Sequence, residues 1–348
     1  MSFFDKFKDK AHAHLSLNIC MLGARGVGKT TVLTSIFNDS RSKDGFARTR
    51  ISMMAKPETR TELAKHRDKL LEVFSKRTDI AVIPPSKGEH IFKFDLGLLG
   101  CTPCVDLTVT DYPGEKLEQE PEYVSEKIRE SEVVIIAIDA PYLMEDGGAY
   151  NEEKNQVALV TKFVEDNLDS FDDKLVMLVP LKCEKYLDLL VEESRRKNRS
   201  EEMFRLICDK FYMRLISLLQ SKGKVAVVVA PILTVGGVVF DRFVYDGQMH
   251  VSKFKFYDGI TADGADAKYF PVFCAQPIIY LLSFVAMKYK RYRNKAGFFG
   301  MLLQSVFDFL DKNEDFLVEM VKVDKLRLKE GNGYKMICGS NLFYSKND

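Results

Sequence analysis

Residues 17–30 read LNICMLGARGVGKT, and this stretch decides the fold of the chain. The apolar run at 17–22 predicts a buried strand, and the eight residues after it match the pattern G-x-x-x-x-G-K-[ST]. The glycines let the backbone curl so that successive N–H groups face one point, and the helix that follows adds a positive N-terminus. The stretch therefore predicts a strand, a phosphate-binding loop and a helix in direct succession.

The last residues of this loop have distinct expected tasks. Lys29 is expected to neutralise the β and γ phosphates of a nucleotide, and the Thr30 hydroxyl is expected to ligate Mg²⁺. The expected nucleotide contacts in this stretch are Gly23, Gly26, Val27, Gly28, Lys29, Thr30 and Thr31.

A second motif, TDYPGE at residues 110–115, follows the apolar run at 105–109. Asp111 leaves the C-terminal end of the predicted strand, where a carboxylate can hold Mg²⁺ through its water shell. The backbone N–H of Gly114 can bond the γ-phosphate, so loss of that phosphate would release the loop. A phosphate-binding loop followed by D-x-x-G indicates a switch GTPase.

A third motif, PLKCE at residues 180–184, follows the apolar run at 175–179. In GTPases an [NT]-K-x-D element reads the base: its lysine covers the purine, and its carboxylate accepts two N–H bonds that only guanine offers. Lys182 and Glu184 have this spacing, although Leu181 replaces the Asn or Thr and Glu replaces Asp. The alternative interpretation makes Lys182 and Glu184 the start of a solvated helix.

These motifs, together with APILTVGG at residues 230–237, resemble a Ras-type P-loop GTPase over roughly Leu17 to Gly237. The DYPGE and KCE stretches are similar to the bacterial double-GTPase group of the translation-factor-related class. The resemblance implies a Mg²⁺-dependent switch that binds GTP and GDP and hydrolyses GTP slowly. Two alternatives are an ATP-using P-loop enzyme (an ATPase or kinase) and a nucleotide-dependent scaffold with little turnover.

The expected catalytic residues are Lys29, Arg25 and Glu115, and the expected metal ligands are Thr30 and Asp111. Ras-like proteins carry a small residue where Arg25 stands, so that an external arginine can approach the γ-phosphate. Arg25 either points to solvent or supplies that charge in cis. Glu115 stands where Ras-like proteins place the glutamine that orients the attacking water.

Short apolar runs alternate with helical patterns along the chain, which predicts an α/β fold. We expect a P-loop NTPase three-layer sandwich with a mostly parallel sheet, one antiparallel edge strand at 91–96 and C-terminal helical additions. The predicted units are an amphipathic N-terminal segment at 1–15, a GTPase domain at 16–292 and a C-terminal helical extension at 293–348.

An insertion is expected at about residues 41–88, because 82 positions separate Lys29 from Asp111. A helix, a switch loop and two strands need about half of that length. The helical pattern at 59–75 is the expected content of the insertion. A switch threonine that completes the Mg²⁺ shell is Thr49, Thr59 or Thr61, and the sequence leaves this choice open.

The composition is that of an ordinary globular protein and argues against a dedicated nucleic-acid binder. Lys and Arg total 51 against 50 Asp and Glu, and 46% of the residues are hydrophobic. A dedicated nucleic-acid binder carries a strong basic excess, so we expect no specific nucleic-acid partner. The expected partners are a guanine nucleotide and an unidentified protein effector.

The seven cysteines suit a reducing compartment, because several of them lie inside apolar runs, and we expect a cytoplasmic location. Cys101 and Cys104 form a C-x-x-C without a second pair at zinc spacing, so a turn between strands is favoured over a metal or redox site. Residues 270–287 approach membrane length but are interpreted as a buried helix. Phe3, Phe4 and Phe7 predict a helix that packs on its own domain, with a weak membrane-surface or partner contact as the alternative.

Overall fold

The computed structural model describes residues 15–39, 51–77, 89–187, 199–257, 269–293 and 335–342. Residues 1–14 of the predicted amphipathic segment and most of the predicted C-terminal extension lie outside these ranges. Thr49, one candidate for the switch threonine, lies outside them as well.

A mixed, mostly parallel sheet of eight strands forms the centre of the molecule, in the order β10-β7-β6-β5-β1-β4-β3-β2. The neighbours from β7 to β4 pair in parallel, and β1 lies between β4 and β5. The strands are β1 (Leu15–Leu22), β2 (Ile51–Ala55), β3 (His90–Leu98), β4 (Val105–Asp111), β5 (Val133–Asp139), β6 (Lys174–Leu181), β7 (Val225–Val229) and β10 (Lys335–Cys338). The strand that precedes the glycine-rich loop is therefore central, as its nearly continuous apolar run predicts.

The two edges of the sheet differ from the prediction. Strand β3 is antiparallel to β4, as predicted, but it is not an edge, because β2 pairs antiparallel with its other side. At the opposite edge β10 pairs antiparallel with β7, inside the region expected to be helical. Both missed strands have only four or five residues, too few for alternation to mark them.

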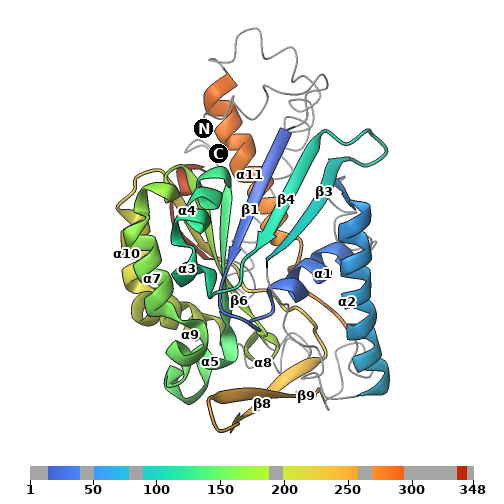
Figure 1. Ribbon diagram of the computed structural model, residues 1–348, viewed down its shortest axis with the longest axis vertical. Coiled ribbons are helices and arrows are strands. Elements are labelled where there is room, and N and C mark those ends of the chain that lie inside the picture. The colour runs from blue at the N-terminus through green and yellow to red at the C-terminus, as the bar shows by residue number, and fades with distance from the viewer. Residues whose placement is uncertain are drawn as a thin grey trace.

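Helices cover both faces of the sheet and complete three layers (Figure 1). Buried residues of α1, α2 and α11 pack on one face, and those of α4, α7, α9 and α10 pack on the other. The α-helices are α1 (Lys29–Asp39), α2 (Pro57–Lys76), α3 (Lys116–Gln119), α4 (Pro121–Glu130), α5 (Ala140–Met144), α6 (Asn151–Asn155), α7 (Val157–Asp166), α8 (Glu184–Leu187), α9 (Ser200–Arg205), α10 (Met213–Gln220) and α11 (Gln276–Arg293), with a π-helix at Leu206–Phe211 between α9 and α10. The predicted α/β sandwich is confirmed.

Helix α2 occupies the predicted insertion and is fixed to its neighbours by polar contacts. The Thr59 hydroxyl accepts a hydrogen bond from the backbone N–H of Lys93 in β3 at 2.8 Å. The Thr61 hydroxyl donates to the carbonyl of Pro57 within the same helix at 3.0 Å. The Thr61 hydroxyl is therefore hydrogen-bonded within α2, and the Thr59 hydroxyl links α2 to β3.

All seven cysteines are free thiols, and Cys101 and Cys104 lie in the turn between β3 and β4. None of the helices within the described ranges combines the length and the apolar character that crossing a bilayer requires. Residues 270–287 instead contribute buried positions of α11 to the core.

Candidate functional site

The carboxyl ends of four parallel strands meet at one edge of the sheet. Met21 in β1 is paired with Asp111 in β4, and Asp139 in β5 is paired with Leu181 in β6. The loops that follow these strands therefore lie together, at the edge where open α/β sheets bind their ligands.

The loop after β1, residues 23–28, is called the P-loop from here on, and its backbone requires glycine. Gly23, Gly26 and Gly28 have φ angles of 140°, 77° and 112°. A Cβ atom on Gly23 would also lie 3.0 Å from the carbonyl oxygen of Ala137. Helix α1 begins at Lys29, directly after the loop, so its free N–H groups and its positive end point toward the space that the P-loop surrounds.

The side chains of Lys29, Thr30 and Asp111 come together beside the P-loop. The Lys29 side chain is 7% exposed, and its ammonium donates to the carbonyl of Gly23 at 2.8 Å and lies 3.5 Å from Asp111 Oδ1. The Thr30 hydroxyl donates to Asp111 Oδ2 at 3.3 Å. Burial raises the pKa of the Asp111 carboxyl, while Lys29 and Thr30 act in the opposite direction. The first two sequence motifs predict that these three residues share one site.

The donor set at this point fits Mg²⁺. A hydroxyl and a carboxylate oxygen from Thr30 and Asp111 are the hard oxygen ligands that Mg²⁺ takes, and the ion usually completes its shell with water and substrate phosphates. The chemistry of these residues therefore matches the predicted metal site.

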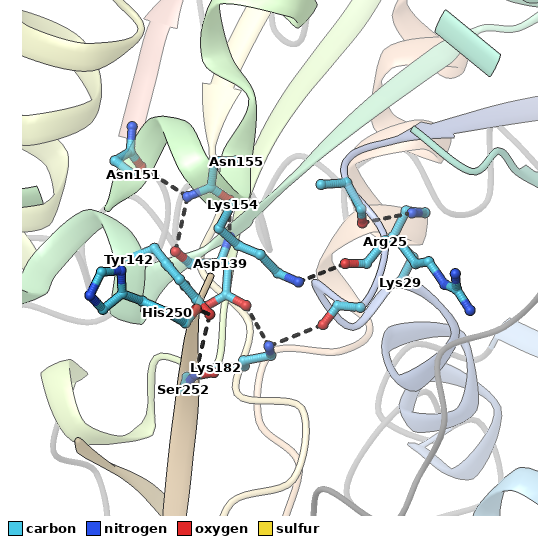
Figure 2. Close-up of polar contacts among 12 residues, drawn as sticks. Arg25, Lys29, Asp139, Tyr142, Asn151, Lys154, Asn155, Lys182, His250 and Ser252 are labelled. Atoms are coloured by element: carbon cyan, nitrogen blue, oxygen red, sulfur yellow. Dashed lines mark hydrogen bonds and ion pairs between the residues drawn. The ribbon is translucent and has the colours of Figure 1, made fainter. Parts of the chain in front are cut away.

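The loop after β4 lies directly against the P-loop. A Cβ atom on Gly114 would be 3.2 Å from Ala24 Cα and 3.3 Å from Gln156 Oε1, so only glycine fits without displacement. Glu115 and Arg25 are exposed. Figure 2 shows the Arg25 guanidinium directed away from the polar cluster on the other side of the loop. The catalytic roles of Arg25 and Glu115 remain predictions.

Lys182 lies across the P-loop. Its ammonium donates to the carbonyl of Gly26 at 3.1 Å and pairs with Asp139 Oδ2. It also lies 5.5 Å from the centre of the Phe254 ring, which belongs to β9 (His250–Phe256). Strand β9 forms a separate hairpin with β8 (Val238–Tyr245), placed beyond the carboxyl edge of the sheet (Figure 1).

Glu184 begins α8, but the helix start is not solvated as the alternative interpretation assumed. The side chain is 2% exposed, and its Oε1 accepts hydrogen bonds from the N–H groups of Val235 at 3.1 Å and Gly236 at 3.2 Å. Burial raises the pKa of this carboxyl to about 7. One oxygen of the predicted base-reading residue therefore joins the loops after β6 and β7, and its role toward guanine stays a prediction.

Stability should fall as the pH rises through the titration of Glu184. Because its folded-state pKa of about 7 lies above the ordinary value of 4.5, the folded state favours the protonated form. This contribution is fully present below the ordinary pKa and lost above about 7. Relative to Glu184→Gln, the native protein should lose about 2–3 kcal/mol of unfolding free energy between pH 5 and pH 8.

Urea unfolding of both proteins at the two pH values measures this difference. Glu118→Gln, at an exposed position, is the matched control and should track the native protein. An equal change with pH in the native protein and in Glu184→Gln would contradict the assignment.

Asp139 and the residues that hold it were not predicted from the sequence. The Asp139 side chain is 0% exposed, and its backbone N–H donates to Asn155 Oδ1 at 2.7 Å. Asn155 Nδ2 donates back to the Asp139 carbonyl at 3.1 Å, so this amide pins α6 to the end of β5. Among the described atoms, Asp139 Oδ1 has no hydrogen-bond partner. An aspartate directly after a buried strand is the signal that identified Asp111, and it could have identified Asp139.

Lys154 of α6 is the second missed residue. Its ammonium donates to the carbonyl of Arg25 at 2.7 Å (Figure 2). Burial lowers its pKa, and the nearby charges of Lys182 and Lys29 lower it further, against the opposite effect of Asp139. Three lysines from three different elements therefore bond to carbonyls of the P-loop.

No protein-family model matches this chain, and no curated protein matches it significantly. Among solved structures, the chain is similar to the GTPase-like domain of Ski7 from S. cerevisiae, which is bound to GTP, with 16% sequence identity and a TM-score of 0.36. The match covers 63% of this chain and 43% of that chain, so the chain spans less than half of the other structure's length. The identification of the candidate site therefore rests on the geometry of its own residues.

Proposed function

We propose that this protein is a Mg²⁺-dependent switch that binds GTP and GDP and hydrolyses GTP. The observation that carries the proposal is the joint placement of Lys29, Thr30 and Asp111 at a glycine-shaped P-loop. An ammonium, a hydroxyl and a carboxylate at this spacing suit a nucleoside triphosphate with its metal ion. The resemblance to the double-GTPase group belongs to the proposal.

Each residue of the site has a proposed role in the reaction. Lys29 and the N–H groups of the P-loop hold the phosphates, and Thr30 and Asp111 hold Mg²⁺, which neutralises charge on the phosphates when bound. The N–H of Gly114 contacts the γ-phosphate, so the loop after β4 is released once that phosphate has left. Glu115 is proposed to orient the attacking water.

Guanine recognition is assigned to Lys182 and Glu184. The Lys182 ammonium donates to the P-loop carbonyl of Gly26, and its aliphatic chain is proposed to cover the base. The Glu184 carboxylate has a second oxygen besides the one bonded to Val235 and Gly236. The competing candidate, an ATP-using enzyme, needs no carboxylate there.

A titration distinguishes these two candidates. GTP and GDP should bind at least about tenfold more tightly than ATP, because a carboxylate that accepts guanine N–H groups is left unpaired by adenine. The measurement is displacement of a fluorescent guanine nucleotide in the presence of Mg²⁺, with chelated metal as the control. Equal displacement by ATP would favour the ATPase or kinase, and binding without single-turnover hydrolysis would favour the scaffold.

The proposed location is the cytoplasm. All seven cysteines, including the exposed Cys101, are free thiols, which suits a reducing compartment. The output of the switch is proposed to be binding of a protein effector, read through the loop at Gly114.

A further inference from the structure

We propose that Lys154 binds the γ-phosphate and supplies, from within this chain, the cation that stabilises the transition state of hydrolysis. The inference deepens the proposed function and rests on it. The sequence motifs offer Arg25 as the candidate for this task, and Lys154 belongs to no motif.

The position of Lys154 is fixed by buried hydrogen bonds of the neighbouring residue. Its neighbour Asn155 exchanges two hydrogen bonds with the backbone of Asp139, at 2.7 and 3.1 Å, and also donates to Asn151 Oδ1 at 2.9 Å. These buried contacts fix α6 to the end of β5, beside the P-loop. The half-buried Lys154 chain then reaches the carbonyl of Arg25, the third residue of the loop (Figure 2). Arg25 stands where the Ras-like proteins that this chain resembles carry the small residue past which an external cation approaches the γ-phosphate.

The charges around the three lysines single out Lys154. Lys29 has Asp111 at 3.5 Å, and Lys182 is paired with Asp139. Among the described residues, no carboxylate lies within ion-pair distance of the Lys154 ammonium, whose hydrogen bond goes to a neutral carbonyl. A partly desolvated ammonium without a counterion favours an arriving anion. Burial lowers its pKa, and the neighbouring cations lower it further against the opposite effect of the more distant Asp139 charge, which agrees with this.

The same segment also reaches the switch loop. Gln156, two residues after Lys154, places its Oε1 3.3 Å from the position that a Cβ of Gly114 would occupy. The end of α6 and the turn into α7 (Val157–Asp166) therefore contact both the P-loop and the loop after β4. Lys154, at the end of α6, is the cationic side chain of this segment that contacts the P-loop.

The reaction leaves Lys154 unchanged. The oxygen of water forms a bond to the γ-phosphorus, and the bond from that phosphorus to the β–γ bridging oxygen breaks, with its electron pair leaving on GDP. Both hydrogens of the water end on the released phosphate. Lys154 leaves the Arg25 carbonyl and donates hydrogen bonds to the oxygens that gain negative charge. Because this charge is largest in the transition state, the effect falls on the rate more than on binding.

The test compares Lys154→Met with Lys154→Arg, using the exposed Lys162→Met on α7 as the control. Three measurements are made on the full chain: single-turnover hydrolysis at saturating GTP, affinity for GTP and for GDP, and thermal melting without nucleotide. Lys154→Met should lower the hydrolysis rate about 100-fold and weaken GTP about 3- to 10-fold more than GDP. Lys154→Arg should recover much of the rate, and Lys162→Met should behave as the native protein.

Each contrary result has a distinct meaning. A native rate in Lys154→Met, or an equal loss of GTP and GDP affinity with a lower melting temperature, overturns the inference and leaves Lys154 as a tether of the P-loop. The proposed function would survive both results. Failure of the native protein to bind any nucleoside triphosphate overturns the function and the inference together.

Discussion

Replacing Lys29 with alanine should weaken GTP binding by about 10- to 100-fold and remove its dependence on Mg²⁺. The ammonium is nearly buried, lies against the carbonyls of Gly23 and Ala24 and faces Asp111. A hydrogen bond between charged groups contributes about 1.5–3 kcal/mol, and this loss corresponds to the stated range of affinity. Without Lys29, Asp111 also loses the cation beside it.

Titration of GTP with and without Mg²⁺ measures the effect, and Lys162→Ala is the matched control because Lys162 is exposed on α7. Thermal melting shows whether the variant remains folded. A change of less than about threefold in a folded Lys29→Ala protein would mean that the P-loop does not bind phosphate.

Gly236→Ala should destabilise the protein by about 3 kcal/mol. Gly236 has a φ angle of 80°, which an L residue rarely adopts, and a Cβ atom there would lie 2.2 Å from the carbonyl oxygen of Phe270. The left-handed conformation costs about 1–2 kcal/mol, and the backbone of Phe270 must move as well. Since the Gly236 N–H also bonds Glu184, GTP affinity should fall together with stability.

Gly247→Ala separates these two causes. Gly247 has a φ angle of 101°, but nothing lies within 4 Å of its Cβ position, so this variant carries the conformational strain without the clash. Urea unfolding should place Gly247→Ala between the native protein and Gly236→Ala. If both variants lose equal stability, the contact with Phe270 contributes nothing.

The fold could be predicted largely because the parallel strands are covered on both faces. Runs such as residues 133–138 are apolar throughout, and β5 is buried along its whole length. Strands β2 and β10 escaped prediction because four or five residues carry too little periodicity. Their pairing is set by partners elsewhere in the chain, with β2 on β3 and β10 on β7.

The candidate site was predictable only where its chemistry depends on local spacing. Lys29 and Thr30 belong to one motif, and Asp111 ends a recognisable strand. The hydrogen bonds of Glu184 could not be predicted, because its partners, Val235 and Gly236, lie 51 and 52 residues further along the chain. The role of Lys154 could not be predicted for a related reason. A lysine in an acidic helical stretch matches no motif, and only the fold brings it into contact with the P-loop.

The pairing of β10 with β7 has a consequence for the order in which the sheet can be completed. The strand β7 reads VAVVV and is buried at every position, and Cys338 in β10 lies 113 residues after Val225. During synthesis on the ribosome, this edge of β7 stays without β10 until those later residues emerge. An unpaired apolar edge is a template on which a second copy can add its own strand, so premature termination before residue 335 would favour aggregation.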